Sequence, residues 1–331
     1  MEHVAIDLGG RESQICIRAA DGGILVEKRV KTAELGRHLA ERSSSRVVME
    51  TCSEAFVIAD AARRLGHEVR VVPATLVRSL GVGARRTKSD RRDAQVLSEV
   101  SCRIDLPSVH VPSQAARDAK TMLGMRDAMV ATRTKLINTV RGWLRATARR
   151  PRGGSSSSFA RRVRAMLMAL PAYVEAQLRV IEAISDEIKR SNDELKKLCV
   201  LDPLCVRLMT VPGVGVVTAL RFVATVDDIS RFESAHKLES YLGLVPGEHS
   251  SSERQCRLGI TKAGSTTMRW TLTQAAWSII RSAKDTALKR WATAIEQRRG
   301  KRIAVVAVAR KIAGILFAIW RDQSVYDPQR S

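Results

Sequence analysis

Aromatic residues are scarce in this chain, at 4% of its 331 positions. Proteins that bind single-stranded nucleic acid without sequence preference usually stack the bases on aromatic rings. A chain with so few rings is better suited to contacts with a phosphate backbone than to base stacking.

Paired cysteines and long apolar runs are also missing. The six cysteines include no Cys-x-x-Cys pair, which argues against a zinc site, and we interpret them as free thiols in a reducing compartment. The N-terminus has Asp7 within its first apolar run, which is untypical of a signal peptide. No uninterrupted apolar stretch approaches the length of a membrane span. We therefore expect a soluble, cytoplasmic, nucleoid-associated protein without a membrane partner.

Acidic residues are too few to balance the basic ones. The chain has 34 Asp and Glu against 56 Lys and Arg, a net charge of +22. Such a chain repels itself and normally has a polyanionic partner, with double-stranded DNA the first expectation. A surface adapted only for solubility is the alternative, although the basic residues run through the whole chain. Apolar residues make up 45%, which suffices for cores, and the length suggests two domains with room for a helical spacer.

The first third of the chain has the residue pattern of three strands, followed by alternating helices and strands. A turn at 21–23 makes the second and third strands a hairpin. The order predicts a mixed sheet flanked by helices. The expected strands are 3–8, 13–18, 24–30, 46–49 and 69–72, and the expected helices are 32–42 and 55–65.

The rest of the chain has helical spacing. A loop is expected at 81–92, with a helix that starts near Asp90 and has Ser89 as its N-cap. The spacing at 178–198 suits a helical hairpin or coiled-coil spacer and, equally, an ordinary bundle helix. Further helices are expected at 113–150, 268–282 and 302–320, with a flexible break at 151–158 and a loop-rich segment at 245–264.

Four carboxylates stand out in the N-terminal third. Asp7 lies inside an apolar strand, where an unpaired charge is costly, and Glu50 ends a later strand. Asp90 and Asp93 are three residues apart at a helix start, hence on one face. A cluster of hard oxygen ligands could hold two Mg²⁺ ions for in-line phosphoryl transfer. Taken singly, each acid could equally be a surface charge, an ion-pair partner or a stabiliser of the helix N-terminus.

The stretches AIDLGG (5–10), VVMET (47–51) and TKSDRRDA (87–94) resemble the DEDD motif of a large insertion-sequence transposase family. That family includes the pilin-gene inverting recombinases and recombinases guided by a bridge RNA. The resemblance implies a RuvC-like domain of the ribonuclease H fold, with Asp7, Glu50, Asp90 and Asp93 as its metal-binding acids.

The segment VPGVGVVTA (211–219) has the pattern of a helix-hairpin-helix. Gly213 and Gly215 would let the turn approach a phosphate backbone, whose oxygens its N–H groups could bind. A tight helix–helix turn without DNA contact is an equal alternative.

The stretch 241–277 is the longest match to the family's second conserved region. The resemblance implies a serine nucleophile, which falls on Ser251, although Ser252 stands where the family usually has glycine; Ser250 is the other neighbour. A serine hydroxyl can attack a phosphodiester and hold a DNA end covalently. Without the resemblance, three serines in a row indicate only a polar loop. Four basic residues nearby could neutralise phosphates or form a solvated face: Arg254, Arg257, Lys262 and Arg269.

Together these patterns predict a RuvC-like domain at 1–110, a helical or coiled-coil spacer at 111–200, and a helix-hairpin-helix domain with a serine loop at 201–331. The predicted function is a DNA transposase or recombinase of an insertion sequence. The resemblance also implies a structured guide RNA and a composite site in a dimer or tetramer. The alternatives are a junction-resolving nuclease that uses metal-activated water, a sugar kinase or actin-like ATPase built on AIDLGG, and a non-catalytic RNA-binding protein.

Overall fold

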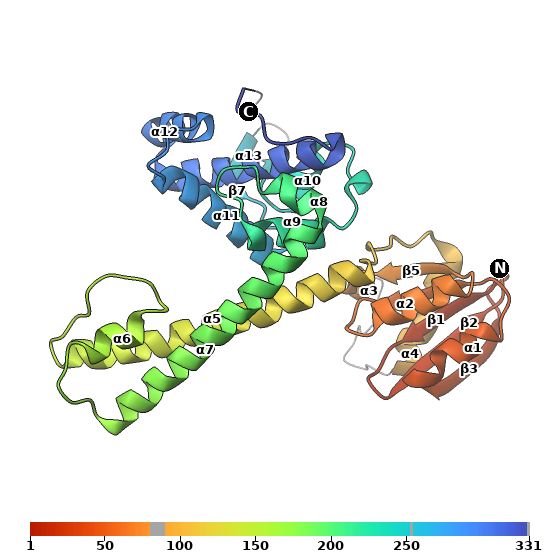
Figure 1. Cartoon of the computed structure of the whole chain (residues 1–331). Helices are drawn as coiled ribbons and strands as arrows, with labels where there is room; N and C mark the ends of the chain where they lie inside the picture. The colour runs from red at the N-terminus through yellow and green to blue at the C-terminus, as the bar shows by residue number, and fades with distance from the viewer. Residues whose placement is uncertain (80–89, 252–253, 330–331) are drawn as a thin grey trace. The chain divides into compact units, whose positions relative to one another are not determined.

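The structure is a computed structural model that describes residues 1–79, 90–251 and 254–329. The side chains of residues 78, 79, 90, 248–251 and 254–257 lie outside the described set. The chain divides into two compact units, Met1–Pro112 and Ser113–Ser331 (Figure 1). The second unit contains both the expected spacer and the expected C-terminal domain, and their boundary near residue 200 stays a prediction.

The first unit is a five-stranded mixed sheet with helices, as the sequence predicted. Its strand order is β3-β2-β1-β4-β5, in which β1 runs antiparallel to β2 and parallel to β4. The strands are β1 (His3–Asp7), β2 (Glu12–Arg18), β3 (Ile24–Lys31), β4 (Arg46–Glu50) and β5 (Glu68–Val72). The helices are η1 (Thr32–Glu34), α1 (Leu35–Ala40), α2 (Ala55–Arg64), α3 (Ala74–Ser79) and α4 (Asp90–Arg103).

Side-chain alternation along β1 and β4 supplies both faces of this sheet with apolar residues. Val4 and Ile6 belong to a core that includes residues of α1 and α2. Ala5 and Val48 point the other way, into a smaller core with Leu97 of α4. Helices therefore cover both faces, and α4 covers the face to which the odd-numbered residues of β1 project.

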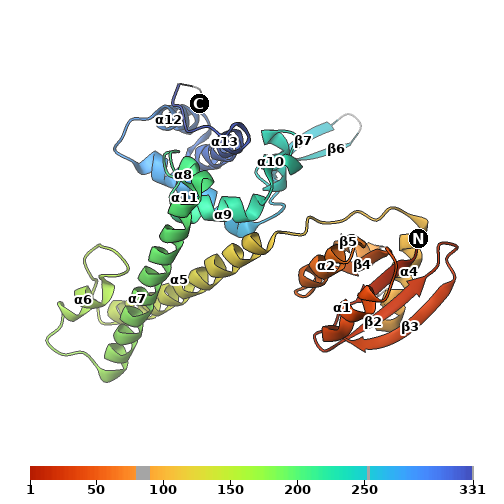
Figure 2. The same ribbon diagram turned by 45° about the vertical axis from the view of Figure 1, so that its right-hand side comes forward.

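The second unit begins with two long helices that lie side by side. They are α5 (Gln114–Ala146) and α7 (Ala172–Leu201) (Figures 1 and 2). The short helix α6 (Phe159–Arg164) lies in the segment of chain that connects them. Arg126 of α5 donates a hydrogen bond to Asn192 of α7. Farther along α5, Leu144 packs in one cluster with Val174, so the two helices run antiparallel.

The rest of the second unit is helical apart from one hairpin. Its helices are α8 (Pro203–Leu208), α9 (Val216–Val226), η3 (Ile229–Arg231), α10 (Ala235–Tyr241), α11 (Thr266–Arg281), α12 (Ala287–Arg299) and α13 (Lys301–Asp322). The hairpin consists of β6 (Pro246–Ser251) and β7 (Arg254–Ile260), which replaces the expected serine loop. Residues 246–251 have little intrinsic strand propensity, so backbone pairing with β7 decides the conformation there.

Helix α13 is long and apolar enough to cross a membrane by length and mean hydropathy alone. Arg310 and Lys311 interrupt its apolar run. In the structure 56% of its most apolar window is buried. Val308, Ile312 and Leu316 are fully buried in the main core of the second unit, and this packing accounts for the hydropathy of the helix.

Candidate active site

Asp7 and Glu50 end two neighbouring strands. β1 and β4 pair in parallel, with His3 opposite Arg46 and Ile6 opposite Met49, so the two acids follow matched positions. Alternation points both acids toward the face of Ala5 and Val48, which α4 covers. Both acids are half-buried.

Helix α4 brings Asp93 to the same end of that face. His3 Nδ1 lies 2.9 Å from Ser101 Oγ, which fixes the far end of α4 against the start of β1. Eight residues of helix, back to Asp93, span about 12 Å. Four residues of strand, forward to Asp7, span about 13 Å. These rises match, so Asp93 is level with Asp7.

The start of α4 is held by β3. Arg91 donates two hydrogen bonds to the carboxylate of Glu27, at 2.6 and 2.9 Å, and Gln95 donates to the same group at 3.0 Å. The bonds from Arg91 lower the pKa of Glu27. Farther along the helix, Arg18 of β2 donates to Ser98 Oγ at 2.9 Å. These contacts fix the rotation and height of the helix that carries Asp93.

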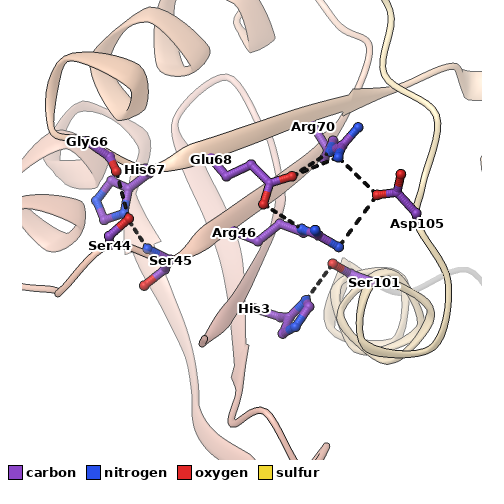
Figure 3. A network of polar contacts seen from close by, with 10 residues as sticks. All are labelled: His3, Ser44, Ser45, Arg46, Gly66, His67, Glu68, Arg70, Ser101 and Asp105. Atoms are coloured by element: carbon purple, nitrogen blue, oxygen red, sulfur yellow. Dashed lines mark hydrogen bonds and ion pairs between the residues drawn. The ribbon is translucent and has the colours of Figure 1, made fainter.

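A polar network holds the opposite end of the face, where β1, β4 and β5 begin (Figure 3). Glu68 accepts hydrogen bonds from Arg46 at 3.0 Å and Arg70 at 2.9 Å, and both arginines also pair with Asp105 beyond α4. Burial raises the pKa of Glu68, but the two arginines outweigh it and the net shift is downward. Sequence reasoning missed this set, although His3 at a buried strand position was a signal for it.

Asp93 is the most informative of the acids. Its side chain is only 7% exposed. Its carboxylate oxygens are not among the described side-chain atoms that are fully buried without a hydrogen-bond partner. Burial of most of the side chain makes its charge costly, and a bound cation would offset that cost. The hard oxygen donors Asp7, Glu50 and Asp93 suit a divalent ion such as Mg²⁺.

The convergence of the four carboxylates stays a prediction. Asp90 is the first residue of α4, as the sequence predicted, but its side chain is outside the described set, and the expected N-cap Ser89 is outside it altogether. Among the described residues, no three His, Cys, Asp or Glu side chains are grouped closely enough to hold a metal ion. The backbone therefore brings three acid positions to one end of one face, and a test must come from experiment.

The predicted serine lies in the hairpin. Ser251 is the last residue of β6 and is opposite Arg254 in the register; Ser250 is opposite Gln255. Ser252 is outside the described residues, as are the side chains of Ser250, Ser251, Arg254 and Arg257. The structure places the backbone of Ser251 at the end of β6 and leaves the choice among the serines open.

The base of the hairpin is held by backbone contacts. Arg269 of α11 donates hydrogen bonds to the carbonyl oxygens of Leu242, Ala263 and Gly264. The Arg269 guanidinium therefore already has a structural task, and its predicted phosphate contact stays untested. Lys262 is exposed and adopts a positive φ of 57°, next to this junction.

The glycine turn at 209–215 joins α8 to α9. Gly213 has φ of 78°, and a Cβ there would lie 2.6 Å from the carbonyl oxygen of Ala275 in α11. Its need for glycine is explained by packing on α11 without any DNA contact. Gly215 precedes α9 and has open space around its Cα. Both glycines are exposed, and the predicted contact of this turn with DNA stays a prediction.

Family comparisons match both parts of the chain. A transposase model of the DEDD type matches residues 4–148, and a model described as the transposase IS116/IS110/IS902 family matches residues 205–292. The putative transposase y4qE of Sinorhizobium fredii is 31% identical over 288 residues, which cover 78% of this chain and 71% of that protein. The chain belongs to the IS110/IS116/IS902 transposase family.

Other relatives match all or part of the chain. The transposase for insertion sequence element IS1111A of Coxiella burnetii is 28% identical over 332 residues, 98% of this chain and 90% of that protein. A pilin gene-inverting protein of Moraxella lacunata is 30% identical over 124 residues, 36% of this chain and 38% of that protein. The expected recognition is confirmed, including the distant likeness to the inverting proteins.

The matched ranges include the candidate residues of this transposase. The first model contains all four acids, and a DEDD nuclease domain implies divalent metal ions. The second contains the glycine turn, the serine hairpin and its basic neighbours. The enzyme is thus a transposase that performs phosphoryl transfer on DNA.

Proposed function

We propose that this transposase cleaves and rejoins DNA at the ends of an insertion element with a metal site formed by Asp7, Glu50, Asp90 and Asp93. The observation that carries the proposal is Asp93, which is only 7% exposed and lies level with Asp7 on the face that α4 covers. Glu50 ends the adjacent parallel strand.

The four acids would hold two Mg²⁺ ions, which supply charge neutralisation for in-line displacement at phosphorus. The task of the protein is to keep the acids in place before DNA arrives. Glu27 fixes one end of α4 and His3 fixes the other, so the height of Asp93 does not depend on loops.

We assign the nucleophile to Ser251. Its Oγ would form a bond to phosphorus, the bond from phosphorus to one nucleoside oxygen would break, and the released hydroxyl would take up a proton. The reverse attack by the hydroxyl of a new strand would free the serine. His249 lies two residues earlier on the same strand and is a candidate acceptor for the serine proton. The resemblance supports this assignment and the composite site in which acids and serine come from different subunits.

One experiment tests both halves of the proposal. Purified wild type, Asp93→Asn and Ser251→Ala are incubated with element-end DNA and Mg²⁺, and products are resolved after protein denaturation. We expect a denaturation-resistant protein–DNA adduct from the wild type only. Loss of a metal ligand or nucleophile should lower the cleavage rate by a factor on the order of 10³ or more.

The matched control is Glu99→Gln, which removes one carboxylate from the exposed side of α4, where Glu99 pairs with Arg103 at 2.6 Å. It should cleave like the wild type. Full cleavage by Asp93→Asn would remove the metal site. Cleavage without an adduct would favour the hydrolytic nuclease, and an adduct that persists in Ser251→Ala would move the nucleophile to Ser250 or Ser252.

We propose that a structured RNA guides the choice of target DNA. The transposase that it guides would be a homo-oligomer. The family resemblance and the net charge of +22 support it. Sequencing the nucleic acid that co-purifies with the protein would test it. A discrete RNA encoded beside the gene is expected, whereas a random mixture of cellular RNA would speak against guidance.

A further inference from the structure

The helical hairpin of the second unit contains a long segment without acids. The 47 residues from 128 to 174 contain ten Arg and Lys and no Asp or Glu. Elsewhere on the hairpin, basic residues alternate with acids, as at Asp193, Glu194, Lys196 and Lys197. Most of the acid-free segment, from residue 149 on, lies outside both family models.

The fold gathers six of these cations around one hollow. A pocket of about 300 Å³ lies at the end of α5, in the loop toward α6 and at the start of α6. Its remaining lining residues are Pro151, Gly153 and Gly154, and no acid lines it. We call this the arginine pocket, and its cations are Arg141, Arg145, Arg149, Arg150, Arg152 and Arg162.

The pocket is carried by an ordered scaffold. Leu144 of α5, Phe159 of α6 and Leu178 of α7 are fully buried in a core of their own at this end of the hairpin (Figure 2). Arg164 fastens α6 to α7 through two bidentate pairs, with Glu175 and with Glu182. The arginines therefore do not belong to a flexible tail, and their spacing is set by the fold.

The pocket cations lack acidic partners. Among the described residues of this end of the hairpin, only Arg164 forms ion pairs. Arg162 donates from Nη1 to Ser155 O and Ser158 Oγ, and its Nε is buried without a hydrogen-bond partner in the described chain. Like charges held close together repel, and a bound anion relieves the repulsion. Guanidinium groups bind phosphate in bidentate fashion, which makes phosphate the fitting anion.

We infer that the arginine pocket is a docking site for the phosphate backbone of double-stranded DNA, separate from the catalytic face. No aromatic ring lines the pocket; of the nearby rings, Phe159 is buried and Trp143 packs on the core. The pocket therefore offers no stacking platform for a single strand. We choose DNA as the ligand because of the proposed function, whereas the position of the site follows from the arginine pocket alone.

The test is salt-dependent binding of the full-length protein to a labelled random-sequence DNA duplex in EDTA, where no cleavage intervenes. The variant is Arg145→Gln/Arg149→Gln/Arg150→Gln, three exposed residues of the pocket. Each lost phosphate contact should lower the slope of log K against log salt by about 0.9. Three contacts should weaken binding at physiological salt by a factor on the order of 10 to 100.

The matched control removes the same charge elsewhere on the hairpin, with Lys189→Gln/Lys196→Gln/Lys197→Gln on exposed positions of α7. It should change the slope far less, because acids already neutralise that stretch. The charge-conserving variant Arg145→Lys/Arg149→Lys/Arg150→Lys should keep most of the affinity of the wild type. Equal tryptophan fluorescence would show that all variants fold.

Equal slopes for the pocket variant and the control would overturn the site. A loss confined to duplex RNA in a parallel titration would overturn the choice of DNA. Because the readout is binding without metal, a negative result here leaves the proposed cleavage chemistry untouched, and an inactive Asp93→Asn would leave this site untouched.

Discussion

Arg221 and Asp127 form the most deeply buried ion pair of the second unit that the structure describes, and its two halves should respond differently to substitution. Arg221 Nη2 of α9 lies 2.7 Å from Asp127 Oδ2 of α5. The arginine side chain is 7% exposed and the aspartate side chain 31%. Arg126 Nη1 lies 3.3 Å from Asp127 Oδ1. Asp127 therefore has a second cationic partner, whereas the Nε of Arg221 is buried without a hydrogen-bond partner in the described chain.

The structure gives the size of each effect. Asp127→Ala leaves a buried guanidinium without its acid, which costs about 2–3 kcal/mol after allowance for the exposed side of the pair. Arg221→Met leaves a half-exposed acid that still contacts Arg126, which costs about 1 kcal/mol. The double variant leaves no guanidinium at position 221, and Arg126 keeps its hydrogen bond to Asn192. Its cost should therefore be about 1 kcal/mol as well, and the coupling energy about 2–3 kcal/mol.

Tryptophan fluorescence in urea measures this directly. All five tryptophans lie between residues 143 and 320, so the signal reports the second unit alone. The free energy of unfolding is compared for the wild type, the two single variants and the double variant at equal m-values. Additive costs, or a larger cost for Arg221→Met than for Asp127→Ala, would refute the reasoning from burial.

Two further predictions concern single residues. Gly213→Ala should destabilise the second unit by about 2–4 kcal/mol in the same urea assay, because Gly213 has a positive φ and a Cβ there would meet the carbonyl oxygen of Ala275. The control Gly215→Ala should change the free energy of unfolding by less than about 1 kcal/mol. Equal effects of the two substitutions would contradict the packing explanation. Burial, and then the charge of Arg46, lower the pKa of His3 from 6.5, so the fold prefers the neutral ring. Stability of the first unit should therefore be full above pH 6.5 and fall as the pH drops through the folded pKa, while His3→Gln flattens this dependence. Hydrogen exchange of β1, corrected for the intrinsic effect of pH, measures it, and an unchanged profile in the variant would assign the loss to other groups.

The sequence alone was sufficient for most elements of the first unit, although it did not predict α3. Short apolar runs at 3–8 and 46–49 predicted two strands, with Asp7 inside the first and Glu50 at the end of the second. The pair Ser89-Asp90 predicted the start of the following helix, and the structure begins α4 at Asp90. Such patterns are local, because each reports which side of one element is buried. The motif likeness, which the family matches confirm, also required nothing but the order of residues.

Tertiary structure alone decided how those elements meet. The contact of His3 with Ser101 sets the position of α4 along the direction of β1. Only that position brings Asp93 level with Asp7. The hairpin at 246–260 depends on a partner strand, and Gly213 is required by a carbonyl more than sixty residues away. The arginine pocket likewise unites the end of α5 with Arg162 of α6. A sequence pattern carries no information on such distances, because they arise from packing between segments that are remote along the chain.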